Sequence, residues 1–394
     1  MSAMMRLEDI SFSDKTVFLR VDFNVPLTDT GEIRDDTRIR ASLPTIQYLI
    51  SRKARLVIAS HLGRPKGKVD PKLSLIPAAK RLSELIGREV ILAPAVVGEE
   101  VDKLKKGLGE GQVLLLENVR FEAAETANDA GFARKLAEGI DVFVNDAFGA
   151  CHRAHASVVA ITQFVKEKAA GRLLEKEVEY LSRAVHAPEK PYVAILGGAK
   201  VSDKIPVIQN LLDKADHILI GGAMAYTFFK AQGCDVGKSL VEDDMKDLAL
   251  DTLKKAQEAK VDLLLPSDHL LAAAVDKDAA TELTASFPFP SDRMAVDIGP
   301  RTAEKYAGII SRARMVVWNG PLGVFEIDKF AQGTMRIAQA VAAAKATTIV
   351  GGGDSIAALQ KAGVSSRITH ISTGGGASLE YLAFGTLPGI DALS

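Results

Sequence analysis

Short apolar runs recur along the chain, each bounded by turn-forming or polar residues and followed by a helix-length segment. The runs lie at residues 17–21, 56–59, 90–92, 113–116, 142–144, 193–196, 218–220, 263–265, 315–318, 347–350 and 370–372. Continuous apolar runs that alternate with helices are typical of parallel strands covered on both faces. Eleven strands are too many for one ordinary sheet, so the pattern predicts an α/β protein with two doubly wound parallel-sheet domains.

An amphipathic helix is predicted between the fifth and sixth runs, over residues 173–185. Its apolar positions recur at helical spacing among charged residues, at Leu174, Val178, Leu181 and Val185. One more covering helix would show the same pattern, but the position between two sets of strands favours a connector helix. The sequence therefore predicts an N-terminal domain at 1–170, a connecting helix at 171–186 and a C-terminal domain at 187–377.

The composition narrows the class of protein. The chain has 394 residues, of which 47% are apolar and 25% charged, as is ordinary for a folded protein of two or three domains. A formal net charge of −1 provides no general attraction for nucleic acid or an anionic membrane. Cys151 and Cys234 are the only cysteines, so neither a disulfide framework nor a CxxC metal site is expected. Without a signal-peptide pattern or an apolar run of membrane-spanning length, we expect a cytoplasmic protein with no nucleic-acid or membrane partner.

Two strand-to-helix turns in the C-terminal part each contain three glycines, at residues 351–353 and 374–376. Glycine lets the backbone approach a ligand closely, and the first turn of a helix offers unpaired N–H groups that bind anions. Two such turns in succession suggest a polyphosphate site, where Asp354 is placed to hold a magnesium ion. For either turn alone, an ordinary glycine turn is the alternative interpretation.

Polar side chains follow several strands of the N-terminal part, where ligands bind in doubly wound sheets. In chain order they are Asp22, Asn24, His61, Arg64 and Arg120, and two further arginines, Arg38 and Arg153, lie nearby in the sequence. Guanidinium groups match phosphate and carboxylate oxygens, whereas a carboxylate or an amide suits hydroxyls. The set predicts a site for a small anionic substrate, although each arginine taken singly would be read as a solvated surface residue.

A third glycine turn, at residues 197–204, carries Lys200 and Lys204, which share a face if the helix has begun. A lysine at this place can reach a terminal phosphate, and two solvated lysines are the alternative. After the strand at 315–318, Asn319 and Glu326 are candidates for binding ribose or base. Neither the P-loop pattern nor GxGxxG is complete anywhere in the chain.

Together these motifs resemble the phosphoglycerate kinase family over essentially the full length of the chain. The matching segments are residues 20–26, 60–65, 116–121, 145–149, 152–155, 197–204, 318–321, 351–354 and 373–378. The resemblance implies a glycolytic phosphotransferase with a carboxyl group as acceptor. Such an enzyme carries out reversible transfer between 1,3-bisphosphoglycerate with MgADP and 3-phosphoglycerate with MgATP. It further implies a monomer of two Rossmann-like domains facing a cleft, with residues 378–394 packing back on the N-terminal domain.

The resemblance also assigns residues to the two ligands. The positions implied for the phosphoglycerate are Asp22, Asn24, Arg38, His61, Leu62, Gly63, Arg64, Arg120 and Arg153. The positions implied for the nucleotide are Lys204, Gly299, Asn319, Glu326, Gly352, Gly353, Asp354 and Ser355, with Asp354 on the magnesium ion.

The expected chemistry needs no general base, because a carboxylate with a pKa of about 3 to 4 is already ionised at neutral pH. Neutralising charge on the moving phosphoryl group is assigned to Arg38 and Lys204, with Lys200 assisting. The N–H groups of Gly374, Gly375 and Gly376 are expected to add fixed donors. Because the two ligands bind to different domains, we expect hinge motion around 173–185 and 373–378.

Two other classes of protein fit part of the pattern. A nucleotide-dependent oxidoreductase uses similar folds, but the missing GxGxxG argues against it. A two-domain metabolite-binding protein without catalysis would also have a hinge. It would not need paired lysines and an aspartate in addition to an arginine-rich anion site.

Overall fold

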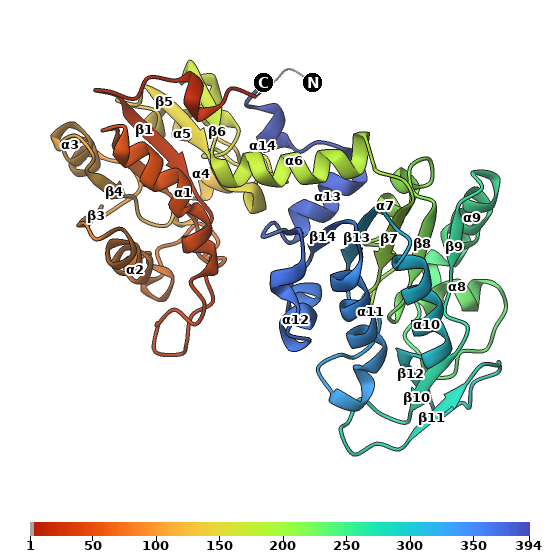
Figure 1. The fold of residues 1–394 in the computed structure, drawn as a ribbon. Helices are drawn as coiled ribbons and strands as arrows, with labels where there is room; N and C mark the ends of the chain where they lie inside the picture. Colours follow the sequence, from red (N-terminus) through yellow and green to blue (C-terminus); the bar gives the residue numbers. More distant parts are fainter. Residues whose placement is uncertain (1–3) are drawn as a thin grey trace. The chain divides into compact units, whose positions relative to one another are not determined.

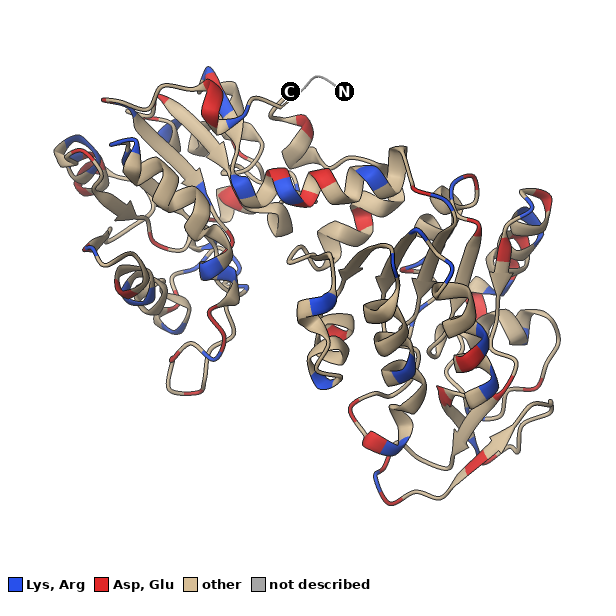
Figure 2. Ribbon diagram, viewed as in Figure 1, with Lys and Arg blue, Asp and Glu red and all other residues tan. Residues whose placement is uncertain are grey.

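The structure is a computed structural model that describes residues 4–394 (Figure 1). The chain forms two compact units: unit 1 extends to Val178 and also includes Thr386–Ser394, whereas unit 2 is Glu179–Gly385. Helix α6 (Arg172–His186) begins in unit 1 and ends in unit 2. Basic and acidic residues are interspersed over each unit (Figure 2), in keeping with a net charge of −1. Within residues 4–394, no helix is long and apolar enough to cross a membrane.

Unit 1 is built on one parallel sheet of six strands in the order β3-β4-β2-β1-β5-β6. The strands are β1 (Thr16–Arg20), β2 (Arg55–Ala59), β3 (Val90–Leu92), β4 (Val113–Leu115), β5 (Val142–Asn145) and β6 (Glu167–Ala170). Its helices are α1 (Thr37–Ser51), α2 (Ile76–Ile86), α3 (Glu99–Gly107), α4 (Ala123–Thr126), α5 (Ala130–Leu136) and α14 (Pro388–Asp391). Short 3₁₀ turns lie at η1 (Leu7–Asp9), η2 (Pro71–Leu73), η3 (Val119–Phe121), η4 (Phe148–Ala150) and η5 (Ala160–Gln163). Every residue of the central strand β1 is buried, as expected where helices cover both faces of a sheet.

Unit 2 contains a second parallel sheet of six strands, in the order β15-β14-β13-β7-β8-β9. The strands are β7 (Tyr192–Leu196), β8 (His217–Ile220), β9 (Asp262–Leu264), β13 (Met315–Asn319), β14 (Thr347–Gly351) and β15 (His370–Ile371). A smaller antiparallel sheet comprises β10 (His269–Ala272), β11 (Thr281–Thr284) and β12 (Met294–Ile298). The helices are α7 (Ile205–Leu211), α8 (Met224–Ala231), α9 (Lys246–Glu258), α10 (Pro300–Ile310), α11 (Gln332–Ala343), α12 (Gly353–Lys361) and α13 (Gly376–Phe384). Three 3₁₀ turns lie at η6 (Asp243–Met245), η7 (Asp328–Phe330) and η8 (Ser365–Arg367).

The predicted fold class is confirmed, and each of the eleven apolar runs overlaps a strand of one of the two parallel sheets. Four strands were not predicted. Strand β6 pairs only with β5 at the sheet edge, and its first two residues, Glu167 and Lys168, are polar and partly exposed. In the small sheet, β11 is mostly exposed and consists of Thr281–Thr284. Strands with little buried apolar surface lack the hydrophobic pattern from which strands are predicted.

The first turn of α6 is held by the buried carboxylate of Asp146, which follows β5. Its Oδ1 accepts hydrogen bonds from the N–H groups of Leu173 at 2.9 Å and Leu174 at 3.3 Å. Burial nevertheless raises the pKa of Asp146 to about 7, and the hydrogen bonds offset this only in part. Below about pH 7 the protonated carboxyl is therefore the main form of Asp146 in the folded protein.

A pKa raised in the folded state gives a stability contribution that is complete below the unfolded value near 3.8 and is lost as pH rises to about 7. We expect the free energy of unfolding of the wild type to fall by about 2–4 kcal/mol relative to Asp146→Asn over this interval. Asparagine keeps the accepting oxygen and does not titrate. Urea unfolding at pH 4.5 and 7.5 measures the difference, with Asp141→Asn, at the exposed amino end of β5, as the control. Parallel pH profiles for the wild type and Asp146→Asn would contradict the assignment.

Candidate functional site

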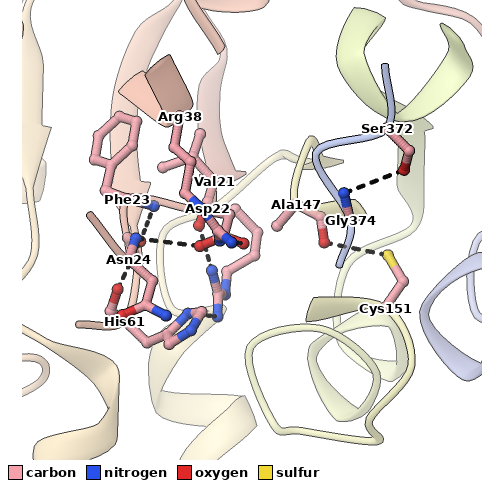
Figure 3. Close-up of polar contacts among 12 residues, drawn as sticks. Val21, Asp22, Phe23, Asn24, Arg38, His61, Ala147, Cys151, Ser372 and Gly374 are labelled. Carbon is pink, nitrogen blue, oxygen red and sulfur yellow. Dashed lines mark hydrogen bonds and ion pairs between the residues drawn. The ribbon is translucent and has the colours of Figure 1, made fainter. Parts of the chain in front are cut away.

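Asp22 and Arg38 form an ion pair at the carboxyl end of β1 in unit 1 (Figure 3). Asp22 is 7% exposed, and its Oδ1 accepts a hydrogen bond from the N–H of Asn24 at 3.1 Å. Burial acts to raise the pKa of Asp22, but the nearby cations and this hydrogen bond lower it overall. An ionised carboxylate and a partly exposed guanidinium therefore lie together where β1 ends, as the strand-end pattern predicts.

The segment that follows β2, at Leu62 and Gly63, is fixed by hydrogen bonds with the side chains of two asparagines. Asn24 Oδ1 accepts from the N–H of Gly63 at 2.9 Å, and Asn118 holds Leu62 through both its N–H, at 3.2 Å, and its carbonyl, at 2.7 Å. Gly63 has φ +60°, and a Cβ there would lie 2.8 Å from the side chain of Leu73. The Leu62 side chain is buried and its backbone groups are engaged by Asn118, so the ligand contact assigned to Leu62 stays a prediction. Because the Asn24 carbonyl is occupied, its amide N–H₂ is the group left for a substrate hydroxyl.

Cations gather around this segment. Arg120 donates from Nη1 to the carbonyl of Gly63 at 2.9 Å, and its pKa is lowered by burial and then by the neighbouring Arg20 and Arg64. Arg64 and Arg153 are exposed, and neither forms an ion pair with a residue of the described chain. Two exposed arginines without an ion-pair partner in residues 4–394 lie with Arg120 and provide a site that suits an anion.

In unit 2 the corresponding place is the junction of β7 and β13. Gly197, after β7, donates its N–H to the carbonyl of Asn319 at 3.0 Å, and a Cβ at Gly320 would lie 2.2 Å from the Gly197 carbonyl oxygen. This close approach of two turns requires glycine. Lys204, 8% exposed, donates from Nζ to Oδ1 of Asn319. Burial lowers the pKa of Lys204 to about 8, although Asp203 and Asp354 act in the opposite direction.

A cavity of about 180 Å³ lies at this junction and brings together seven residues predicted from the sequence. They are Lys200, Lys204, Asn319, Gly352, Gly353, Asp354 and Ser355. Gly353 and Asp354 occupy the first turn of α12, so their position suits a negatively charged ligand group. The Ser355 hydroxyl accepts a hydrogen bond from the N–H of Gly320 at 2.6 Å and thereby ties α12 to β13.

A second cavity, of about 260 Å³, shares Gly198, Ala199, Pro321 and Asp354 with the first. Glu326 lines it, as predicted, together with Asp297 and with Tyr226, which was not predicted. The available signal for Tyr226 was the Gly221-Gly222 turn after β8, which has the same strand–glycine–helix form as the other turns.

Gly299 and the last glycine turn lie outside these two cavities. Gly299 donates its N–H to the carbonyl of Asp268 at 2.8 Å, and a Cβ there would lie 2.2 Å from the Asp268 carboxyl carbon. Gly374 donates its N–H to the hydroxyl of Ser372 at 3.2 Å (Figure 3). Gly376 begins α13, so its N–H belongs to a first helical turn, as predicted. The assigned ligand contacts of Gly299 and of Gly374, Gly375 and Gly376 stay predictions.

Known proteins resemble the chain along nearly its whole length. A family model described as "Phosphoglycerate kinase" matches residues 7–384. "Phosphoglycerate kinase" of Acidobacterium capsulatum is 56% identical over 399 residues, and that of Anaeromyxobacter sp. is 55% identical over 393, with 99% of each chain covered. The solved phosphoglycerate kinase from Coxiella burnetii is 43% identical with a TM-score of 0.90, covering 99% of this chain and 98% of its own. The structure from Pyrococcus horikoshii OT3 is 40% identical with a TM-score of 0.84 and has the same coverage.

The lowered pKa of Lys204 predicts that a polyphosphate binds together with a proton. With a pKa of about 8, roughly three quarters of Lys204 is neutral at pH 8.5 and about a tenth at pH 7. A phosphate beside Nζ favours the charged form, so we expect ADP binding to take up close to that fraction of a proton at each pH. Titration calorimetry in buffers of different ionisation enthalpy measures the uptake. Lys204→Arg, which stays charged, is the control, and equal uptake in the two proteins at pH 8.5 would disprove the prediction.

Proposed function

The chain belongs to the phosphoglycerate kinase family, and we propose that unit 1 binds the phosphoglycerate while unit 2 binds the magnesium nucleotide. The protein has phosphoglycerate kinase activity in glycolysis, so it is a phosphotransferase with a carboxyl group as acceptor. The observation that carries the division of ligands is the set of arginines around His61 and Asp22, where few carboxylates balance the cations. A substrate with both a phosphate and a carboxylate supplies the missing negative charge.

Within unit 1, we assign each part of the phosphoglycerate to a group of matching chemistry. Arg64, Arg120 and Arg153 bind the phosphate, because guanidinium forks pair with its oxygens and two of these arginines are exposed. Asp22 and the Asn24 amide bind the hydroxyl. Arg38 binds the reacting carboxylate, because its guanidinium group is only partly buried beside Asp22 and stays accessible to a ligand.

Within unit 2, we assign the phosphates to the glycine-rich cavity beside Lys204 and the ribose and base to the cavity reached by Glu326 and Tyr226. No group of three or more potential metal ligands occurs among residues 4–394. A single carboxylate, Asp354, at a phosphate cavity nevertheless fits magnesium, which is usually held by one or two carboxylates together with substrate phosphates. When bound, the ion neutralises charge on the nucleotide phosphates.

Transfer then requires positioning and charge neutralisation, with no proton to remove. The acceptor carboxylate is ionised at neutral pH, because its pKa is about 3 to 4. Arg38 and Lys204 stabilise charge on the moving phosphoryl group, Lys200 assists, and the N–H groups of residues 374–376 add fixed donors. We further propose that the protein acts as a monomer in the cytoplasm, where its two cysteines stay reduced.

The assignment of Arg38 is tested by the rate of ATP-dependent phosphorylation of 3-phosphoglycerate in an assay coupled to NADH oxidation. Arg38→Ala is expected to lower kcat by at least about a hundredfold, with nucleotide affinity unchanged, because it removes a cation from the transition state. Arg40→Ala, on the same helix but paired with Asp36, is the matched control and is expected to retain activity. Turnover that survives in Arg38→Ala would rule out the assigned role of Arg38. A folded wild type that binds both ligands without turnover would rule out the activity itself.

Because the ligands are assigned to different units, in-line transfer requires those units to approach each other, and we propose closure by hinge motion in α6 and near residues 373–378. The radius of gyration is therefore expected to decrease when 3-phosphoglycerate and a non-hydrolysable magnesium nucleotide are both present, and to change less with either alone. Small-angle scattering measures this change. A radius that does not respond to the ligand pair would rule out closure.

A further inference from the structure

Arg20, the last residue of β1, is a fully buried arginine that none of the roles above uses. Its side chain is 0% exposed, and all three guanidinium nitrogens have partners. Nε donates to Ser157 Oγ at 2.8 Å, Nη1 donates to the carbonyl of Val21, and Nη2 lies 3.2 Å from Nδ1 of His61. Burying a guanidinium is costly unless it is paired, so these contacts call for a functional explanation.

The contact with His61 defines where that ring carries its proton. A guanidinium has donors only, so Nδ1 of His61 must accept the hydrogen bond, and the ring proton then resides on Nε2. His61 is 5% exposed and faces Asp22 after β1, Arg38 on α1, Arg120 in η3 and Arg20 itself. Burial lowers the pKa of His61 well below its usual value, and the three arginines act in the same direction against Asp22. The ring therefore stays neutral at physiological pH.

Ser157, which accepts a hydrogen bond from Arg20, is itself hydrogen-bonded to a buried carboxylate. Glu125, 0% exposed, accepts from the N–H of Ser157 at 2.9 Å and from its hydroxyl at 2.6 Å. Because the Ser157 hydroxyl proton is directed to Glu125, its oxygen is free to accept from Arg20 Nε. Donor and acceptor directions thus agree along the whole chain of contacts from Glu125 through Ser157 and Arg20 to His61.

We propose that Arg20 is a positioning residue for the phosphoglycerate site: it fixes His61 as the neutral tautomer whose Nε2–H is the donor to the substrate anion. The inference rests on the proposed placement of phosphoglycerate beside His61. Figure 3 shows the His61 ring together with Asp22, Asn24 and Arg38. A purely structural role, in which Arg20 only balances Glu125 and closes the strand end, would leave the proton of His61 unspecified. The two roles therefore differ in their consequences for the position of the proton on the His61 ring.

The state of the ring is measured directly in the unaltered protein. Nitrogen-15 NMR of histidine-labelled wild type, with His61→Gln used to assign the signal among the seven histidines, is expected to show neutral His61 protonated at Nε2 from pH 5.5 to 8. A ring protonated at Nδ1, or one that titrates near 6.5, would overturn the inference even if no Arg20 variant folds.

The consequence for binding is measured as the ratio of KM for 3-phosphoglycerate between Arg20→Met and wild type, so that titration of the substrate phosphate cancels. We expect a ratio of about ten at pH 8, because a neutral His61 ring protonated at Nδ1 instead of Nε2 cannot donate a hydrogen bond to the substrate. The ratio is expected to stay near ten down to pH 5.5, because burial, Arg38 and Arg120 still keep the ring neutral when Arg20 is removed. A ratio near one, or nitrogen-15 NMR of Arg20→Met that still shows a neutral His61 protonated at Nε2, would favour a structural role and overturn the proposal.

Two controls separate the possible failures. Arg55→Met removes an arginine from the amino end of the neighbouring strand, opposite Thr16, and is expected to leave KM unchanged. In a His61→Gln background, where no tautomer needs to be set, Arg20→Met is expected to add less than a threefold change in KM. If neither His61→Gln nor Arg20→Met changes KM, His61 has no role in binding and the inference fails with it, whereas failure of the NMR result alone leaves the proposed function intact.

Discussion

Both sites depend on how one buried strand in each unit is paired. β1 and β7 are buried along their whole length and have a parallel neighbour on each side. From each of these strands the chain continues first to the neighbour on one side and only later to the neighbour on the other. The turns at the carboxyl ends therefore diverge and leave room for a ligand. Asp22 lies at this place in unit 1, and the Gly197 turn lies there in unit 2.

The two sites manage buried positive charge in different ways. Unit 1 uses arginines, which do not release their protons at physiological pH, and partial compensation comes from Asp22 and Glu125. Unit 2 uses Lys204, for which burial lowers the pKa to about 8, so that deprotonation reduces the cost of burial when no anion is near. Lys204, with a pKa of about 8, can therefore take up the remaining fraction of its proton when a phosphate of the proposed nucleotide binds beside it. A permanent cation suits a site that attracts a small, highly charged substrate.

The sequence predicted most of this architecture because the central strands are apolar and the site residues directly follow them. It did not predict β11, where exposure removes the apolar pattern, or β6, whose polar start is tolerated at a sheet edge. It also missed β10 and β12, although both are largely buried. His61 and Arg120 were predicted as members of a set of polar residues that follow buried strands, and Arg38 because it lies shortly after the Asp22 segment in the sequence. Tyr226 was not predicted, since an aromatic residue in a helix is usually part of a core, and only the tertiary structure places it on the cavity that Glu326 also lines.

Arg20 shows why a residue that acts through another is harder to recognise from sequence. It lies inside the apolar run at residues 17–21, and a reading based on hydrophobic pattern assigns the whole run to the core. The assignment is correct, because Arg20 is buried. Yet a strand covered on both faces can retain a charge only where hydrogen bonds and an opposite charge compensate its desolvation, as Ser157 and Glu125 do here. Since an apolar residue would fill the same position without that requirement, an arginine within such a run is itself evidence for a role at the adjoining site.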